Sequence, residues 1–496
     1  MTPRDPSSEG QDLPERPDAT DRPRVGVDEW VERVAGSREA GWQGVLRRRL
    51  ERVPVWAKLP LLVLPIALFP LFTSSDYLMQ VGIDTLIFML LALGLTVAVG
   101  WAGLLDLGYI AFFGFGAYGY AMLASGHFDI HLQAQWVIPI VTAATVLLGF
   151  LVGLPSRRLV GDYLAIVTLF FLQLFLTIML NADRLNVPFH KGEINFTRGP
   201  NGISDIDPMR FFGWKLESLD DYFYLALIAF VVVFVGLAFV NNSRTGRAWR
   251  ALREDPLAAE LMSMPVNKLK LLAFAFGAGV AGLTGTILAA SQGAVFPVNF
   301  DLTLLITLYA MVILGGFGSL PGVAVGAIAI NVSLEALRTP ENASWIFFGL
   351  LAVCLPFVIK PLWRWGAVVA GTIVFGFVVH GLADAFWERG TSAQVIGDTR
   401  IDRFVDSWTL LPTDPVELGR AGYLLLVAGV LGLTLLKGWW RTIAYIPVLY
   451  LAVCVWENVM VAQPAVSRYI LIGAMLVALM AARPQGLFGT TRVEIV

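Results

Sequence analysis

Long apolar windows recur along almost the whole chain and constrain its fold more than any other feature. Windows of about 15 to 20 apolar residues with few charges are long enough to cross a bilayer as helices. Only 15% of the 496 residues are charged, whereas soluble domains carry about 25%. The sequence therefore predicts an all-α, polytopic helical membrane protein with about 10–14 transmembrane segments.

Fourteen apolar cores are recognisable, and several are short enough to be re-entrant or broken helices. They lie at about 59–73, 80–100, 107–124, 136–154, 163–181, 222–240, 271–291, 302–316, 322–336, 346–359, 366–384, 421–436, 443–462 and 467–482. Alternate connections hold most Lys and Arg residues, above all 241–270, whereas the loops 182–221 and 385–420 have mixed charge. By the positive-inside rule, both termini are predicted to be cytoplasmic.

The chain lacks the residue patterns of enzyme catalysis. No G-x-x-x-x-G-K-[ST] loop is present to cradle a nucleotide. The four histidines form no H-E-x-x-H pair and the two cysteines form no C-x-x-C pair, so no catalytic residue and no metal site is predicted. His380 and Asp384, one helical turn apart, are better explained as a packed or water-facing polar pair than as an ion site. The net charge of −2 gives no indication of a nucleic-acid partner.

A charged stretch from Arg244 to Lys270 lies on the predicted cytoplasmic side. Small and apolar residues recur on one helical face, and Pro256 suits the first turn of a helix. A short helix of this kind can dock into a groove of a soluble partner, and its direct continuation into the next span would carry the partner's motion into the membrane. An ordinary amphipathic connector is the alternative. The face comprises Ala248, Leu252, Leu257, Ala258, Leu261 and Met262.

This stretch, GRAWRALREDPLAAELMSMPVNKLKLLAFAFGAGVAGLTG, resembles the coupling segment of ABC-importer permeases of the branched-chain amino acid (LivM) type. Further stretches are similar to signatures of that family and occur in the family's order. They are LALGLTVAVGWAGLLDLGYIAFFGFGAYGYAML (91–123), GLPSRRLVGDYLAIVTLFF (153–171), TRGPNGIS (197–204), VILGGFGSLPGVAVGAIAI (312–330) and RPQGLFG (483–489). The resemblance covers about 78–336 and 467–489.

The resemblance implies a permease in the cell membrane that works with a second permease subunit, two cytoplasmic ABC ATPases and an extracytoplasmic substrate-binding protein. ATP and Mg²⁺ would be bound by the ATPases, and this chain would hold no cofactor. Residues implied to couple to the ATPase are Arg247, Glu254, Asp255, Ala258, Ala259, Glu260 and Ser263. Glycines implied to pack or bend the translocation domain are Gly114, Gly116, Gly315, Gly316, Gly318 and Gly322.

Two short departures from the family pattern are present. Asp106 and Tyr109 replace the Ser and His of the usual GLLSLGH and are candidate polar residues of the pathway. An acid at that depth is costly unless it faces water or a partner, so Asp106 would tune the pathway, contact a basic substrate or pair with an Arg. A merely interfacial carboxylate is an equal alternative. Ser263 and Pro265 stand where the family usually has Gly and a polar residue, so the coupling helix is expected to end differently.

The longest departures suggest a division of the chain into five parts. About four extra apolar cores separate the core from the last span, and their even number keeps the orientation of that span. Residues 29–58 have apolar side chains at helical spacing and a run of basic residues. A helix of this kind lies either on a membrane surface or against its own protein. The parts are a disordered cytoplasmic tail 1–28, an amphipathic interfacial helix 29–58, a core permease domain 59–337, an inserted membrane region 338–465 with the outer loop 385–420, and a last span with a cytoplasmic tail 466–496.

Transport of leucine, isoleucine and valine is the leading functional hypothesis, with urea or short-chain amides as the nearest rival because their importers use similar permeases. An ion-coupled secondary transporter would need paired ionisable residues at mid-membrane and internal repeats, and the sequence offers only isolated acids. A membrane scaffold without transport would explain the packing glycines but leaves the charged segment 244–270 without a purpose.

Overall fold

The computed structural model describes the greater part of the chain. The described residues are 55–156 except 74, 162–338 except 184 and 187–192, 362–386, 407–410, 415–436, 438–462 and 486–488, with isolated residues at 346–355, 412 and 469–480. The predicted tail 1–28, nearly all of the predicted interfacial helix 29–58, most of the outer loop 385–420, half of the last apolar core 467–482 and most of the tail after it lie outside these residues.

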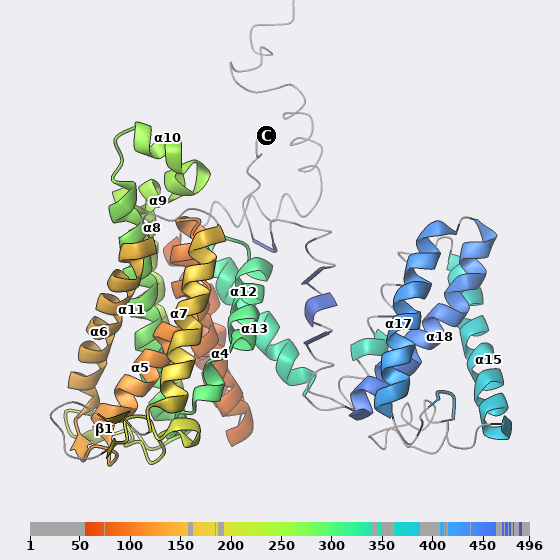
Figure 1. The fold of residues 1–496 in the computed structure, drawn as a ribbon, viewed down its shortest axis with the longest axis horizontal. Coiled ribbons are helices and arrows are strands. Elements are labelled where there is room, and N and C mark those ends of the chain that lie inside the picture. Colours follow the sequence, from red (N-terminus) through yellow and green to blue (C-terminus); the bar gives the residue numbers. More distant parts are fainter. Residues whose placement is uncertain are drawn as a thin grey trace, which may run out of the picture. The chain divides into compact units, whose positions relative to one another are not determined.

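One helical bundle contains the core of the chain (Figure 1). Helix α3 (Val55–Phe72) precedes the bundle in the sequence. The helices of the bundle are α4 (Asp76–Leu95), α5 (Tyr109–Leu123), α6 (Ala134–Ser156), α7 (Asp162–Asn181), α8 (Leu219–Asn242), α9 (Arg244–Glu254), α10 (Pro256–Leu261), α11 (Val266–Gln292), α12 (Leu302–Gly315) and α13 (Leu320–Ala336). A π-helical turn, η1 (Thr96–Trp101), continues α4. The short 3-10 helices are η2 (Gly199–Asn201) and η3 (Pro297–Phe300).

Three two-stranded antiparallel hairpins complete the core. They pair β1 (Ala124–Ser125) with β2 (Ile130–His131), β3 (Leu185–Asn186) with β4 (Glu193–Ile194), and β5 (Arg210–Phe211) with β6 (Trp214–Lys215). Figure 1 shows β1 at the end of the bundle opposite to α10. The two ends are therefore distinct, and by the charge argument the α10 end is the predicted cytoplasmic one.

The helices confirm a polytopic, all-α membrane protein. Among the described residues, seven helices are long and apolar enough to cross a bilayer, and five shorter helices are apolar. Their positions match the predicted cores closely, because a run of 18 or more apolar residues satisfies its backbone hydrogen bonds in lipid only as a helix.

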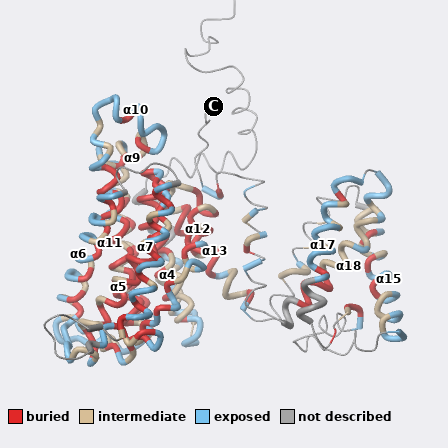
Figure 2. The backbone as a smooth tube through the Cα atoms, viewed as in Figure 1, coloured by how far each residue is buried: buried red, intermediate tan, exposed pale blue. Residues whose placement is uncertain are grey.

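Helix α11 forms the centre of the core bundle and packs against α4, α5 and α6. Most of its residues are buried (Figure 2). A Cβ atom on Gly282 would overlap Thr145 of α6, and one on Gly116 of α5 would overlap the Gly282 carbonyl oxygen. Because helices in lipid gain little hydrophobic drive to associate, this close backbone approach supplies the packing.

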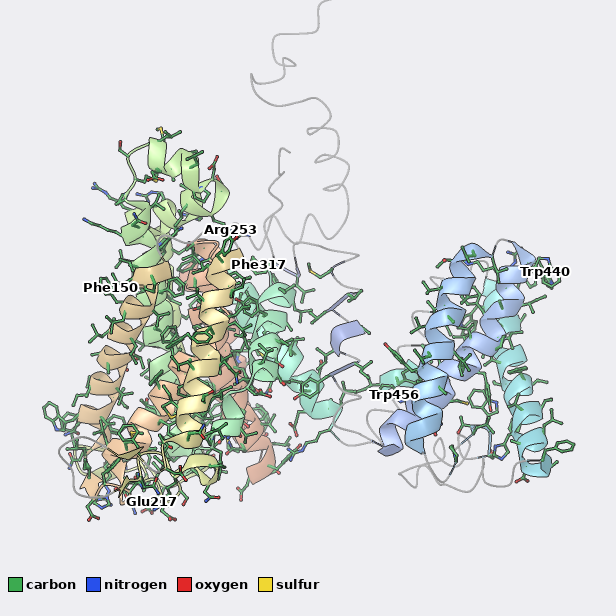
Figure 3. All side chains as sticks on the ribbon, viewed as in Figure 1. Phe150, Glu217, Arg253, Phe317, Trp440 and Trp456 are labelled. Atoms are coloured by element: carbon green, nitrogen blue, oxygen red, sulfur yellow. The ribbon has the colours of Figure 1, made fainter. Side chains whose placement is uncertain are left out.

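The outer faces of α6, α7 and α8 carry large apolar side chains that are exposed. Phe150 of α6, labelled in Figure 3, and Ile166 of α7 are exposed examples. Exposed apolar surface of this extent is expected where the surrounding solvent is lipid. These faces therefore mark the lipid-facing perimeter of the bundle.

The TRGPNGIS stretch closes the outer end of the core. Thr197 donates a hydrogen bond from Oγ1 to the carbonyl oxygen of Met179 at the end of α7 (2.8 Å). Ile203 pairs with Val295, which follows α11. Gly202 has a positive φ of 63° and lies against the Val295 carbonyl, where a side chain would overlap. The motif therefore ties together segments distant in sequence.

Three long helices lie within the predicted inserted region. They are α15 (Leu362–Phe386), α17 (Pro415–Leu435) and α18 (Trp439–Ala462), and α18 packs against both others. The Trp408 indole donates from Nε1 to the Ile373 carbonyl (2.8 Å) and meets the Tyr450 ring edge-to-face at 5.3 Å. Trp456, labelled in Figure 3, stacks on Phe347. This region thus has a hydrophobic cluster of its own.

Two polar side chains inside this second bundle form hydrogen bonds with backbone carbonyl groups. The Asn458 amide nitrogen donates to the carbonyl oxygens of Leu410 and Cys454, both at 2.8 Å. His380 Nδ1 lies 2.9 Å from the Thr409 carbonyl oxygen. His380 is therefore held by packing within the bundle, as the interpretation of a packed polar group proposed.

Candidate functional site

The charged segment 244–270 contains two short helices and the first residues of the next span, with a short turn between α10 and α11. Helix α9 ends at Glu254, α10 is a separate short helix, and α11 begins at Val266. Pro256 occupies the first turn of α10, as predicted. The Asp255 carboxylate Oδ1 accepts the backbone N–H groups of Leu257 (2.8 Å) and Ala258 (3.0 Å) and caps α10.

The structure exposes six of the seven residues implied to contact the ATPase. Arg247, Glu254, Asp255, Ala258, Glu260 and Ser263 are exposed. Ala259 is buried against the chain's own residues, and its implied contact with the ATPase stays a prediction. Its backbone holds the turn after α10, where the Met264 N–H donates to the Ala259 carbonyl oxygen (3.1 Å).

Large apolar side chains cover the tip of α10. The exposed fractions are 67% for Leu257, 78% for Leu261 and 76% for Met262. Helix α10 protrudes from the end of the bundle opposite to the outer hairpins (Figure 1), so these side chains do not belong to the lipid-facing perimeter. Exposed apolar residues rimmed by charges mark a protein interaction surface. We call Leu257, Leu261 and Met262, together with the charged residues Glu254 and Glu260 at their rim, the α10 tip.

Trp249 anchors the inner face of α9. The buried indole donates from Nε1 to the carbonyl oxygen of Leu269, at the start of α11 (2.8 Å). Its ring stacks on Trp101 of η1, with centroids 6.3 Å apart, and meets Phe276 of α11 edge-to-face. One side chain thus fixes α9 both to α11 and to the end of α4.

Arg253, one turn after Trp249, reaches two further elements. Its guanidinium Nη1 donates to the carbonyl oxygen of Gly100 in η1 (2.6 Å). The guanidinium also lies over the Phe317 ring, 5.7 Å from the centroid, in the turn between α12 and α13 (Figure 3). The Arg253 side chain packs on Gly103, which has a φ of 67° and leaves no space for a Cβ atom.

The turn between α12 and α13 depends on glycine at four positions. Gly316 and Gly318 have φ angles of 104° and 86°, which favour glycine. Gly315 and Gly322 face each other so closely that a Cβ on either would overlap the other's backbone. The structure thus places two of the implied glycines at bends and two at a close contact. Trp101 Nε1 donates to the Gly318 carbonyl oxygen (3.2 Å) and joins this turn to η1.

The RPQGLFG stretch meets the same turn. The backbone N–H of Leu487 donates to the Leu314 carbonyl (2.8 Å), and that of Phe488 donates to the Gly315 carbonyl (3.1 Å). The last carbonyls of a helix have no partner inside it. The C-terminal stretch therefore caps α12 with its own backbone.

Asp106 lies buried in the loop between η1 and α5. Its Oδ1 accepts the backbone N–H of Gly108 (2.9 Å), which forms an Asx-turn just ahead of α5. Its carbonyl oxygen accepts the Tyr309 hydroxyl (2.9 Å). Among the described residues, no Lys or Arg lies within 4.0 Å of the carboxylate, so the predicted pairing with an Arg is not found there.

The loop around Asp106 also joins two of the sequence signatures. The Leu107 N–H donates to Thr168 Oγ1 of α7 (2.9 Å), and Gly108 lies against the Thr168 carbonyl. Tyr109 is buried, and its hydroxyl, which has no hydrogen-bond partner, lies against Gly94 of α4. Gly114 lies against the Phe175 ring of α7. These residues pack the junction of α4, α5 and α7.

Trp101, Trp249, Arg253 and Phe317 were absent from the sequence-based set of site residues. We call these four residues, together with Gly100 and Gly318, the cytoplasmic node. The node places α9 in direct contact with η1 and with the α12–α13 turn. A displacement of α9 would therefore reach both elements through side chains already in contact.

Comparison with known proteins identifies the family. A model of the branched-chain amino acid transport system / permease component family matches residues 77–359. The chain belongs to this family. The match covers more than half of the chain and includes α4–α13, all elements of the cytoplasmic node and the α10 tip.

Individual relatives extend this comparison. The chain is 36% identical to the high-affinity branched-chain amino acid transport system permease protein LivM of Escherichia coli K12, over 61% of this chain and 72% of LivM. It is 24% identical to the LivH permease protein of Salmonella typhimurium, over 54% of this chain and 88% of LivH. It is also 24% identical to the fructose import permease protein FruG of Bifidobacterium longum, over 66% of this chain and 90% of FruG. No solved structure matches the chain.

These findings establish the class of the protein. The chain is a multi-pass permease subunit of a transport system in the cell membrane. The apolar helices and the family match agree on this assignment.

Proposed function

We propose that this permease serves a binding-protein-dependent ABC importer of leucine, isoleucine and valine, and that the α10 tip is its docking element for a cytoplasmic ATPase. The observation that carries the docking proposal is the exposure of Leu257, Leu261 and Met262 on a helix outside the bundle. Leu257 and Leu261 are four residues apart on this short helix, a spacing that suits insertion into a groove, and Met262 follows directly. Glu254 and Glu260 supply charge at its rim.

The transport system would contain two ATPases, a second permease and an extracytoplasmic binding protein. The ATPases bind ATP and Mg²⁺, because this sequence has no phosphate-binding loop. Similarity to both LivM and LivH, which are permease proteins named for one kind of transport system, supports a related second permease.

Nucleotide binding would switch the pathway through the cytoplasmic node. Closure of the ATPases displaces the α10 tip, and α9 moves with it because Asp255 alone separates the two helices. Trp249 and Arg253 then transmit the displacement to η1, α11 and the α12–α13 turn. The effect of nucleotide is a shift between outward-open and inward-open states, each stabilised by its own contacts.

Branched-chain amino acids are favoured as cargo because the LivM and LivH proteins of other bacteria are named for them. Similarity to a fructose permease indicates that this fold also serves other solutes. Urea or short-chain amides are therefore the alternative cargo. An ion-coupled transporter working alone is disfavoured, because an exposed docking helix has no purpose without a soluble partner.

Uptake by membrane vesicles tests both parts of the proposal. Vesicles with the full complex are loaded with ATP, and uptake of labelled leucine, isoleucine, valine and urea is measured. Wild type is compared with Leu261→Asp and Glu260→Arg, and Asp205→Arg at the outer end serves as the control for co-purification of the ATPase. We expect both α10 variants to lose the ATPase and the uptake. Leucine uptake that survives both changes would refute the docking proposal, and uptake of urea alone would refute the cargo.

A further inference from the structure

The hairpin β5–β6 has a turn that the fold itself does not explain. Phe212 and Gly213 form the two-residue turn, with positive φ angles of 50° and 93°. Such turns favour Asn or Gly at both positions, and a positive φ is costly for a bulky side chain. Burial of the Phe212 ring does not compensate for this cost, because Phe212 is 89% exposed and the neighbouring Trp214 is 79% exposed.

The hairpin is fixed at the level where a span begins. The Phe212 backbone N–H donates to Gln135 Oε1 (2.6 Å), and β5 packs on α6. Gln135 belongs to the first turn of α6, which is one of the candidate spans. Glu217, two residues after β6, is labelled in Figure 3 at the outer end of the bundle. The hairpin therefore lies at the outer boundary between bilayer and water.

Exposed side chains of α6 continue this surface along the lipid-facing perimeter. Trp136, next to Gln135, is exposed, and Ile140, Leu147 and Phe150 follow on the same helix. Helix α6 buries only a minor part of its span inside the chain. The aromatic tip of the hairpin is thus continuous with a face that contacts lipid.

The composition of the hairpin suits a lipid headgroup region. Trp and other aromatic rings concentrate at membrane–water interfaces, and Arg and Lys side chains reach phosphate groups there. Arg210 and Lys215 flank the turn and are exposed. Lys215 donates to Glu217 Oε1 (2.6 Å), and this hydrogen bond lowers the pKa of the Glu217 carboxyl. The positive charge of Arg210 also lowers this pKa, so the exposed cluster carries two cations and one carboxylate.

We propose that the β5–β6 hairpin is an interfacial anchor, which inserts Phe212 and Trp214 into the headgroup region of the outer leaflet beside Trp136. This anchor goes beyond the proposed transport function, because it fixes the outer loops at one depth whichever solute is carried. The insertion of the Phe212 and Trp214 rings into lipid offsets the cost of the left-handed Phe212 backbone.

Fluorescence quenching in proteoliposomes tests the anchor. Phe212→Cys and Trp214→Cys are introduced separately into the full chain after Cys354→Ala and Cys454→Ala, and each is labelled with an environment-sensitive fluorophore. Asp205→Cys, on an exposed polar position of the outer loops, is the matched control. Doxyl groups on phosphatidylcholine, near the headgroup, are expected to quench the labels at 212 and 214 at least about twofold more than the control label.

The opposite pattern would overturn the proposal. If aqueous iodide quenches the labels at 212 and 214 as strongly as the control label, and doxyl lipid leaves them unquenched, then the tip faces water. Protection of these labels from iodide only when an extracytoplasmic binding protein is added would assign the hairpin to a protein partner instead. Because the quenching is measured without transport, the result is independent of whether the proposed cargo is right.

Discussion

Arg253 and Gly100 are joined by a 2.6 Å hydrogen bond between the guanidinium Nη1 and the backbone carbonyl oxygen. The bond links α9 to the π-helical end of α4, although the two residues are 153 positions apart in the sequence. π-Helical turns occur frequently at functional sites, since their backbone is already displaced from regular helix geometry. The segment of α4 that α9 contacts is therefore one that is suited to bending.

Replacement of Arg253 is expected to uncouple ATP hydrolysis from transport. In Arg253→Ala the contacts with Gly100 and Phe317 are lost, while the α10 tip remains intact. Uptake should fall about tenfold, which corresponds to a loss of about 1.4 kcal/mol of coupling, and the ATPase should still co-purify with normal hydrolysis. Vesicle uptake and phosphate release, measured on the same preparation, check this.

Arg250→Ala is the matched control for Arg253→Ala. Arg250 lies on the same helix, and its Nη2 donates to Asn241 at the end of α8, outside the cytoplasmic node. Its loss should leave the ratio of uptake to hydrolysis near that of wild type. Equal uncoupling in both variants would show that the node has no special role, and loss of the ATPase in Arg253→Ala would show that Arg253 serves docking instead.

Glycine at position 263 is expected to stabilise the protein. Ser263 has a φ of 61°, in the left-handed region, and it is exposed. This conformation costs an L-residue about 1–2 kcal/mol, and the greater freedom of glycine in the unfolded chain offsets about 0.4–1 kcal/mol of the gain. Ser263→Gly should therefore raise the free energy of unfolding by about 0.5–1 kcal/mol. Thermal unfolding in detergent measures the change.

The neighbouring position gives the opposite expectation. Met262 is exposed and has a φ of −80°, which any residue adopts. Met262→Gly gains no relief of strain and should lower the free energy of unfolding by about 0.5–1 kcal/mol. If Ser263→Gly and Met262→Gly destabilise the protein equally, the left-handed turn is not the source of strain.

The helices of the core were predictable from sequence, whereas the contacts of the cytoplasmic node were not. Apolar length alone locates α4, α6, α8 and α11, because lipid forces such segments to be helical. The break between α9 and α10 was signalled by Pro256, and Ser263 with Pro265 indicated a different end of the coupling helix, but the left-handed backbone at Ser263 was not predicted. The apolar face predicted from sequence included Leu261, whereas the coupling residues implied by the family resemblance did not.

Long-range partners account for the rest of the difference. Trp101 and Trp249 stack on each other, yet nothing in the sequence near either residue identifies the other. The family resemblance marked Gly318 as a bend but did not indicate that Arg253 reaches the adjacent Phe317. Such pairings arise when helices assemble, and the apolar periodicity that predicts each helix does not specify them.

Asparagine at position 106 is expected to preserve both stability and uptake. The Asp106 carboxylate accepts the Gly108 N–H, and an amide oxygen accepts the same hydrogen bond. Asp106→Ala leaves that buried N–H without a partner, which should cost about 1–3 kcal/mol of the free energy of unfolding. Thermal unfolding and leucine uptake of both variants are the measurements. If Asp106→Asn abolishes uptake without changing stability, the negative charge itself acts in the pathway.

Alanine at position 116 is expected to loosen the centre of the bundle. A Cβ atom on Gly116 of α5 would overlap the Gly282 backbone of α11, and neither helix can move aside without disturbing α6, which packs on both. Gly116→Ala should lower the free energy of unfolding by about 1–3 kcal/mol. Gly236→Ala on α8 is the matched control, because nothing lies within 4 Å of its added Cβ, and there the higher helix propensity of alanine should raise stability by up to about 1 kcal/mol. Thermal unfolding of the two variants is measured in one detergent. If α5 and α11 approach each other closely at Gly116, the free energy of unfolding falls in Gly116→Ala and rises in Gly236→Ala.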